Sequence, residues 1–429
     1  MQVFKFGGAS LKNADAFKKA VTILRVENVS PLILVVSAMG KTTNLLENIH
    51  KSWIYENDNL SELYNHAYNY HFEIIDSLFT KPHKVRNQVD EIFSQLNSII
   101  RNRCKNDIEF DISYDVIIPF GELLSSIILS NYLEQEQILS SLLDARKVIF
   151  TDNTYREGRI DWDKTSKAIK NEVNKYLSIE PNQIIITQGF IGTSAENKTI
   201  TLGREGSDFT AGIFAHCLNA SKVTIWKDVA GLFNADPKNF ENVSLIPHIS
   251  YHEAVELAYY GQSIIHPKTI KPLQNKKIPL YIRSFNDMNA KGTTIDDNTD
   301  DDNYIPSFII KKNQFLVSVS PKDFSFINEN NLSLIFEILF NNGVTANVIQ
   351  NSAISFSFCC DYNSDLISKL VKDLKKEFFV RYNKNLELIT IRNYNNEIID
   401  ELMANKNIYL EQKSRMTAQI VVGENCVKG

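Results

Sequence analysis

Short apolar runs alternate with amphipathic segments through the first two-thirds of the chain. The segment after the first run places Ala16, Phe17, Ala20, Ile23 and Leu24 at helical spacing. Near-continuous apolar strands separated by helices predict a mostly parallel sheet that helices cover on both faces, a three-layer αβα domain. The runs predicted as buried strands are residues 3–6, 31–36, 116–118, 183–186, 222–226 and 279–282.

Beyond this region the pattern changes. Residues 44–104 read as a polar-rich helical insertion, and the acidic, turn-rich run 296–303 reads as a linker. After it, strand and helix patterns follow in the order β-α-β-β-α-β, which predicts an α+β, ferredoxin-like unit. Residues 417–422 look like a fragment of a second such unit. We therefore predict a catalytic domain over residues 1–295 and a second region over 305–429.

Composition narrows the class of protein. The chain has 429 residues, 43% hydrophobic and 23% charged, with a net charge of −5, which argues against a nucleic-acid binder. No apolar stretch reaches the length expected of a membrane span, and the N-terminus lacks a signal-peptide layout. Five cysteines without CxxC spacing make a disulfide framework or a zinc site improbable. We expect a cytoplasmic protein with free thiols and no membrane partner.

The strand-to-helix turn at the N-terminus predicts phosphate chemistry. Gly7 and Gly8 let backbone N–H groups approach an anion, the next helix adds its dipole, and Lys5 places a cation beside them. A Gly-Gly turn near a lysine is common, so this signal alone is weak. It is not a Walker A loop, because the lysine precedes the glycines, and Val35 stands where Gly40-Lys41-Thr42 would need its first glycine. A GxGxxG loop is also absent.

Four further segments follow predicted strands. Residues 37–44 are small and hydroxylic, residues 121–125 open a helix with Glu122, and residues 203–208 form a second glycine-rich helix start. Residues 226–238 add lysines and aspartates. Each of these segments also has a purely structural explanation, such as a loop that caps a helix or a carboxylate that complements a helix dipole. Together, two glycine-rich helix starts with nearby cations and acids, and no histidine motif, favour phosphoryl transfer by positioning and charge.

These segments, in this order, resemble the aspartokinases of the amino-acid kinase family. The resemblance extends through residues 187–192, 250–254 and 266–267, and the C-terminal region resembles the ACT domains that regulate such enzymes. It implies phosphorylation of the aspartate β-carboxylate by ATP with Mg²⁺, the first step of lysine, threonine and methionine synthesis. A carboxylate nucleophile is ionised at neutral pH and needs no general base.

The resemblance also assigns roles to residues. Lys5 would bridge the transferring phosphoryl oxygens, and Asp208 would orient it and assist Mg²⁺. The residues implied for aspartate are Ser37, Thr43, Glu122, Arg204 and Ser207. Those implied for ATP are Gly7, Gly8, Ser10, Gly203, Lys227, Asp228, Phe233, Lys238 and Ser263. Those implied for an effector amino acid, lysine or threonine, are Thr345, Ala346, Asn347, Gln350 and Asn351.

Several positions depart from the family's usual pattern. Ala9 stands where threonine is usual, Glu205 where a small residue is usual, and Ser263 where a nucleotide-binding lysine is common. Asn347 replaces an aspartate of some lysine-inhibited relatives. A kinase for another acidic amino acid and a catalytically weakened amino-acid sensor therefore stay open as alternatives. ACT units pair edge to edge, so the resemblance implies a homodimer through residues after about 305.

Overall fold

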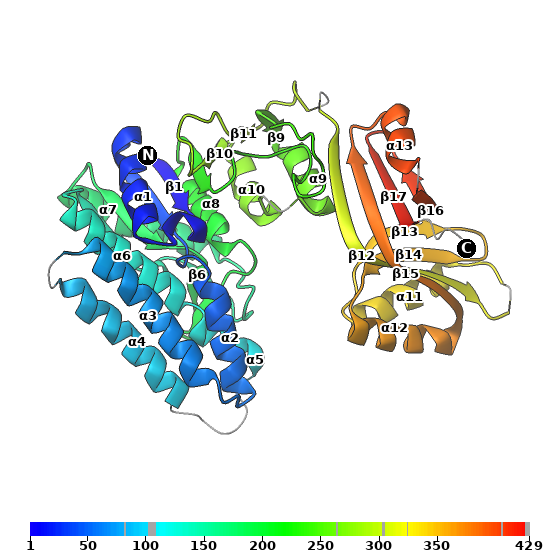
Figure 1. The fold of residues 1–429 in the computed structure, drawn as a ribbon, viewed down its shortest axis with the longest axis horizontal. Helices are drawn as coiled ribbons and strands as arrows, with labels where there is room; N and C mark the ends of the chain where they lie inside the picture. Colours follow the sequence, from blue (N-terminus) through cyan, green and yellow to red (C-terminus); the bar gives the residue numbers. More distant parts are fainter. Residues whose placement is uncertain are drawn as a thin grey trace. The chain divides into compact units, whose positions relative to one another are not determined.

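The computed structural model describes residues 1–80, 83–101, 109–262, 265–302, 305–323, 325–404 and 406–424. They form two compact units (Figure 1). The first comprises Met1–Leu232, Leu245–Val255 and Ile264–Thr299, and the second comprises Phe233–Ser244, Glu256–Ser263 and Asp300–Gly429. The sequence analysis assigned both short segments of the second unit to the catalytic domain. They belong with the second unit because Ala235 bridges to Phe308 and the Gln262 amide donates to the Phe233 carbonyl.

The first unit is built on an eight-stranded sheet of order β3-β5-β2-β1-β8-β10-β11-β9. All its neighbouring strands pair in parallel except β10 and β11. A small sheet of order β4-β6-β7 accompanies it. The bounds are β1 Gln2–Phe6, β2 Leu32–Val36, β3 Ser140–Leu143, β4 Phe150–Thr151, β5 Ile184–Gln188, β6 Ile191–Ser194, β7 Thr199–Thr201, β8 Val223–Lys227, β9 His248–Ser250, β10 Leu280–Ser284 and β11 Thr293–Asp296.

Helices cover both faces of this sheet, which gives the predicted three layers (Figure 1). Phe4 and Phe6 of β1 join one hydrophobic core with residues from α1 through α6. The intervening Lys5 points to the other face, where α8 packs on β1, β2 and β8 and contacts α7 and α10. The bounds are α1 Ala14–Glu27, α2 Thr42–Ile54, α3 Leu60–Leu78, α4 Lys84–Arg101, α5 Phe110–Ile117, α6 Phe120–Gln135, α7 Trp162–Ile179, α8 Gly206–Leu218, α9 Tyr251–Tyr260 and α10 Pro267–Gln274.

The strand predicted at residues 116–118 is wrong, because these residues belong to the end of α5 and the turn into α6. The helix that carries Glu122 therefore follows another helix and not a strand. A run of three apolar residues fits a buried helix as well as a strand, and Ile117 and Ile118 are fully buried in the core. Pro119 directly precedes α6, a place where its missing N–H costs little.

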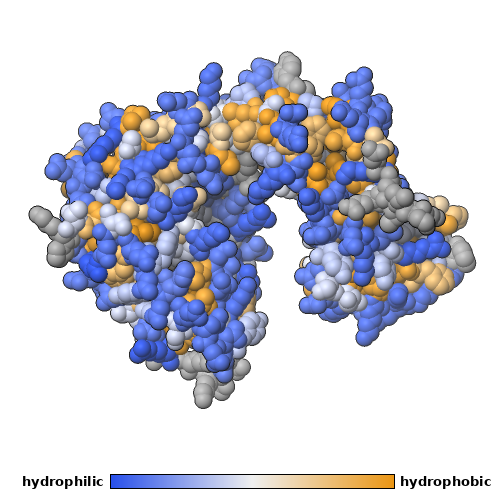
Figure 2. Space-filling model, viewed as in Figure 1, coloured by the Kyte–Doolittle hydropathy of each residue, from blue (hydrophilic) through white to orange (hydrophobic). Residues whose placement is uncertain are grey.

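The same region corrects the expectation that no apolar stretch is long enough to cross a membrane. Within the described ranges, one helical stretch, Phe110–Gln135, is long and apolar enough by length and composition. Its most apolar window is 78% buried inside the structure, as in the core helix of a globular domain. Hydrophilic residues cover most of the face of the first unit that Figure 2 shows.

The second unit is a six-stranded antiparallel sheet of order β13-β14-β12-β15-β17-β16. The long strands β12 and β15 run through two adjoining cores. Helices α11 and α12 cover one core around Phe315 and Phe358, and the short α13 covers the other around Ile389 and Ile420. The bounds are β12 Ser307–Pro321, α11 Glu329–Asn341, β13 Ala346–Asn351, β14 Phe356–Asp361, α12 Ser364–Glu377, β15 Phe378–Arg392, α13 Asn396–Met403, β16 Lys406–Lys413 and β17 Thr417–Glu424.

The first of these cores carries the predicted β-α-β-β-α-β order, from β12 through β15. The second has only one helix, α13, between β15 and the hairpin of β16 and β17. The helices begin at the residues that usually cap them: Asn363 accepts from the backbone N–H groups of Asp365 and Leu366, and Asn328 forms a capping box with Asn331.

Candidate active site

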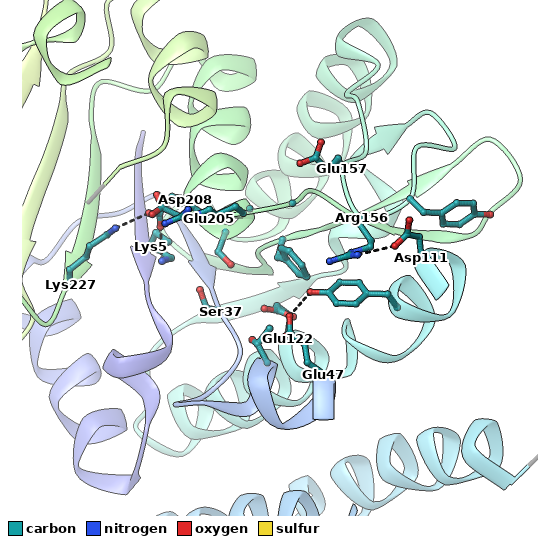
Figure 3. A pocket seen from close by; sticks show the side chains of 18 residues that line it. Lys5, Ser37, Glu47, Asp111, Glu122, Arg156, Glu157, Glu205, Asp208 and Lys227 are labelled. Atoms are coloured by element: carbon teal, nitrogen blue, oxygen red, sulfur yellow. Dashed lines mark hydrogen bonds and ion pairs between the residues drawn. The ribbon is translucent and has the colours of Figure 1, made fainter. Parts of the chain in front are cut away.

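A cavity of about 770 Å³ opens in the first unit, where the carboxyl ends of parallel strands meet the start of α8 (Figure 3). Its wall collects residues far apart in the sequence. The lining residues are Lys5, Ser37, Thr43, Glu47, Asp111, Tyr114, Glu122, Tyr155, Arg156, Glu157, Phe190, Gly203, Arg204, Glu205, Gly206, Ser207, Asp208 and Lys227.

At one end of the cavity, one carboxylate holds two ammonium groups. Asp208 Oδ1 lies 2.5 Å from Lys5 Nζ, and Asp208 Oδ2 lies 3.1 Å from Lys227 Nζ. Burial alone would raise the pKa of Asp208, but Lys227 and Lys5 outweigh burial and lower it. Burial likewise opposes the charge of Lys227, yet Asp208 and Glu205 raise its pKa. This cluster stays charged and presents two cations to an anionic ligand.

Close backbone packing explains one of the two glycines beside Lys5. A Cβ on Gly8 would lie 2.8 Å from the carbonyl oxygens of both Ala38 and Gly40, and the Gly40 N–H donates to the Gly8 carbonyl. Only glycine allows the loop after β1 to pass so close to the loop after β2. A Cβ on Gly7 would lie 3.4 Å from Lys5 Nζ, an ordinary van der Waals contact, so the close packing concerns Gly8.

Glu122 lies in the first turn of α6, fully enclosed, and faces the same cavity. The Ala38 backbone N–H donates to its Oε1 at 3.2 Å, whereas no described group makes a hydrogen bond to the buried Oε2. Burial raises the pKa of Glu122 to about 8, against smaller lowering effects from that hydrogen bond and from Lys5. A cationic ligand group beside Oε2 would supply the missing partner and favour the ionised form.

The turn before α8 brings Arg204 and Ser207 to the cavity. Gly203 and Glu205 both have left-handed backbone conformations, with φ of 79° and 54°. A Cβ on Gly189 would lie 2.6 Å from Ser207 Oγ, so this glycine permits the close approach of the two loops. Thr210 fixes the same turn, because its hydroxyl donates to the Gly206 carbonyl and accepts from the Phe190 N–H.

The far end of the cavity carries a second charged group that the sequence analysis missed (Figure 3). Arg156 Nη1 lies 2.9 Å from Asp111 Oδ1, and its guanidinium lies 4.5 Å from the centre of the Tyr114 ring. The Tyr114 hydroxyl donates to Glu47 at 2.9 Å. The sequence could have predicted Glu47 as a site residue, because it lies four residues after Thr43 on the same face of a helix. It could not have predicted Arg156, because only the fold brings the loop of Arg156 to α5.

The predicted site residues are distributed as follows. Lys5, Asp208 and Lys227 lie at one end of the cavity, and all five residues implied for aspartate, with Gly203, line it. Gly7, Gly8 and Ser10 lie behind this wall, where Ser10 Oγ donates to the Trp226 carbonyl. Asp228 is exposed next to Lys227.

Three residues implied for ATP do not belong to the described part of the first unit. Phe233 and Lys238 belong to a segment of the second unit, and Ser263 lies outside the described residues. Their assignment to ATP stays a prediction.

The predicted effector segment lies in the second unit. Thr345, Ala346 and Asn347 line a hollow of about 690 Å³ together with aromatic residues such as Tyr259 and Phe340. The residues that line this hollow do not include Gln350 and Asn351, which are exposed on the edge strand β13. The Asn347 side chain is already engaged, because it accepts from Lys311 and donates to Gln314 and Asp361.

Comparison with known proteins adds sequence relatives to this geometry. The bifunctional aspartokinase/homoserine dehydrogenase of Buchnera aphidicola is 32% identical over 307 residues, which are 69% of this chain and 36% of the relative. The lysine-sensitive aspartokinase 3 of Escherichia coli is 27% identical over 359 residues, which are 84% of this chain and 78% of the relative. The chain thus spans about a third of the first relative's length and most of the second's.

The fold has a close counterpart among solved structures. The crystal structure of E. coli aspartokinase III in complex with aspartate and ADP superposes with a TM-score of 0.83 and covers 98% of this chain and 96% of that one. At 24% identity this likeness shows a shared fold. The profile of the amino acid kinase family matches residues 1–284, about two-thirds of the chain. The chain therefore belongs to the amino acid kinase family.

Proposed function

We propose that this protein is an aspartate kinase, which transfers the γ-phosphoryl group of ATP to the β-carboxylate of L-aspartate and releases 4-phospho-L-aspartate and ADP. Relatives from two bacteria carry the name aspartokinase, and the solved structure with the same fold holds aspartate and ADP. The family match alone does not name the acceptor, so the site must support the choice of substrate.

One observation supports an acidic amino acid as the acceptor of the phosphoryl group. The same cavity that holds the Lys5, Asp208 and Lys227 cluster also holds the buried Glu122, whose Oε2 has no hydrogen-bond partner among the described groups. A buried carboxyl oxygen without a partner is costly unless a ligand supplies one. An α-ammonium group fits this requirement. Arg204 on the same wall can pair with the α-carboxylate through two N–H donors.

This placement leads directly to a mechanism. A β-carboxylate oxygen of aspartate attacks the γ-phosphorus, the bond from that phosphorus to the bridging oxygen breaks, and ADP leaves. The attacking carboxylate needs no base, so the protein must neutralise charge and align two anions. Lys5 supplies the ammonium group closest to the transfer, and Asp208 holds it in place at 2.5 Å. Ser37, Thr43 and Ser207 offer hydroxyl groups to the bound amino acid.

ATP-dependent transfer of this kind uses a magnesium ion to offset phosphate charge. Within the described ranges, no group of three or more His, Cys, Asp or Glu residues could hold a metal ion. We therefore expect the nucleotide phosphates and water to provide most magnesium ligands, as is usual for this ion. Asp208 and Glu205 are the carboxylates at that end of the cavity.

An assay of aspartate-dependent ADP release, with glutamate in place of aspartate as the comparison, tests this function. Activity with aspartate and little with glutamate is the expected result. In addition, replacing Arg204 with alanine should raise the KM for aspartate on the order of 10–100-fold, because a charge-assisted pair is lost. A protein that releases no ADP in the presence of aspartate and only binds amino acids would instead be a sensor, and this proposal would fail.

We further propose a cytoplasmic homodimer that lysine or threonine regulates through Thr345, Ala346, Asn347, Gln350 and Asn351. The name of the E. coli relative, lysine-sensitive aspartokinase 3, supports lysine as a candidate, and β13 offers an edge strand for pairing with a second copy. Calorimetry with each amino acid, and a mass measurement in solution, test these two points. Heat from neither amino acid, or a monomer, would reject the corresponding point.

A further inference from the structure

The nucleotide end of the cavity contains a second carboxylate beside Asp208, that of Glu205, to which the proposed transfer step assigns no role. This residue directly precedes α8 and has a left-handed backbone, with φ of 54°, a conformation that residues other than glycine rarely adopt. Its side chain makes no capping hydrogen bond to the helix. A glycine would suit the backbone better, so the side chain needs another explanation.

The side chain of Glu205 belongs to the charged cluster. It lines the cavity with Lys5, Lys227 and Asp208, and Figure 3 shows it beside Asp208. Its Oε2 is buried and has no hydrogen-bond partner among the described residues. Burial raises the pKa of Glu205, Lys227 lowers it and Asp208 raises it, so the carboxyl group interacts with the charges of this cluster.

An ionised Glu205 offsets one of the positive charges at this end of the cavity. Lys5, Lys227 and Arg204 are the cations that act on Glu205, and Asp208 is the other carboxylate. Without Glu205 this group would have a larger excess of positive charge. A nucleotide polyphosphate without metal carries several negative charges, and repulsion by a nearby carboxylate is strong where water is largely excluded. A nucleotide that arrives with a divalent cation has much of this charge neutralised.

We propose that Glu205 is a specificity-determining residue that makes the site select the metal–nucleotide complex over the metal-free nucleotide. This inference rests on the proposed function, because it requires a nucleotide at the Lys5 end of the cavity. The selected ligand class is a nucleoside polyphosphate with a bound divalent cation, and the means of selection is repulsion of the uncompensated phosphate charge.

Calorimetric titration with ADP, once with excess Mg²⁺ and once with EDTA, tests this inference at constant salt. For Glu205→Gln we expect metal-free ADP to bind about tenfold more tightly than in the wild type, with a change of at most about twofold for Mg–ADP. Glu205→Gly should behave in the same way, and its backbone suits the left-handed turn. Glu62→Gln, on the exposed surface of α3, is the control for the same change in net charge.

The possible outcomes separate the two proposals. Unchanged affinity for metal-free ADP in both Glu205 variants would overturn the inference and leave the proposed function intact. Weaker binding of Mg–ADP with unchanged metal-free binding would also overturn it, since Glu205 would then act as a direct metal ligand. A wild-type protein that binds no ADP in either buffer would overturn the proposed function as well.

Discussion

The two ends of the cavity each carry an ion pair, and the pairs differ in their burial. The side chains of Lys5 and Asp208 are 9% and 2% exposed, whereas those of Arg156 and Asp111 are 43% and 55% exposed. Both pairs have short N–O distances, 2.5 and 2.9 Å. A distance alone would therefore rank them as similar. Burial separates them, because water screens the exposed pair and cannot replace a lost partner in the buried one.

This difference in burial indicates which end of the cavity is suited to the reaction. The buried pair has a third member, Lys227. Lys5 and Lys227 lie near the ends of strands of the central sheet, and Asp208 lies at the start of α8. The exposed pair joins α5 to a loop after β4. A cation on a rigid, enclosed wall acts on a developing charge without first reorganising water, which favours the Lys5 end as the place of phosphoryl transfer.

The largest expected effect is on stability, from Asp208→Asn. The substitution keeps the shape of the side chain but leaves two ammonium groups close together with Glu205 as the main remaining counter-charge. We expect a loss of about 3–5 kcal/mol in the free energy of unfolding, measured by urea denaturation without ligand. ADP should recover part of this loss by supplying negative charge. A loss below about 1 kcal/mol would mean that the buried and exposed pairs do not differ as argued.

The next effect is on turnover, from Lys5→Met. This change removes the cation and keeps much of the aliphatic chain, so folding should survive. We expect kcat to fall about 10²–10³-fold, as when one preorganised donor to a developing charge is removed. The measurement is the initial rate of ADP release at saturating aspartate and ATP. Lys164→Met, on the exposed surface of α7, serves as control, and near wild-type turnover in the Lys5 variant would remove Lys5 from the mechanism.

Glu122 gives a pH test at the middle of the cavity. Its pKa is about 8 in the folded protein, above the ordinary 4.5, so the folded form binds a proton more tightly than the unfolded one. Stability of the empty protein should therefore fall as the pH rises from about 5 to about 8. Glu122→Gln should flatten this dependence and be more stable than the wild type at pH 8 by on the order of 2 kcal/mol. Parallel stability profiles for the two proteins would rule out a neutral Glu122 in the empty site.

The smallest expected effect is the loss of stability when the exposed ion pair is broken. Asp111→Asn breaks the exposed pair with Arg156 and should cost less than about 1 kcal/mol in the free energy of unfolding. Added salt should reduce the difference further, because the pair lies in water. Urea denaturation at low and high salt measures both. A cost equal to that of Asp208→Asn would show that Arg156 is held far more firmly than its exposure indicates.

The sequence by itself determined the parts of this protein that local patterns encode. The apolar run at residues 3–6 predicted the buried strand β1, and the order of strands and helices predicted the three layers and the α+β second region. The glycine-rich segments that follow predicted strands pointed to the carboxyl edge of the sheet, since parallel strands all end there. The roles of Lys5, Glu122, Arg204 and Asp208 came from the resemblance to the aspartokinases, and Glu122 follows a helix and not the predicted strand.

Only the tertiary structure decided what depends on contacts between distant segments. It made residues 116–118 the end of a helix and the turn after it, because buried apolar residues such as Ile117 and Ile118 suit a helix as well as a strand. It brought Arg156 to Asp111 across 45 residues and moved residues 233–244 into the second unit. It also left one carboxyl oxygen of each of Glu122 and Glu205, the Oε2 atom, buried without a described hydrogen-bond partner. Burial and pairing depend on contacts throughout the fold, and the spacing of residues along the sequence does not encode these contacts.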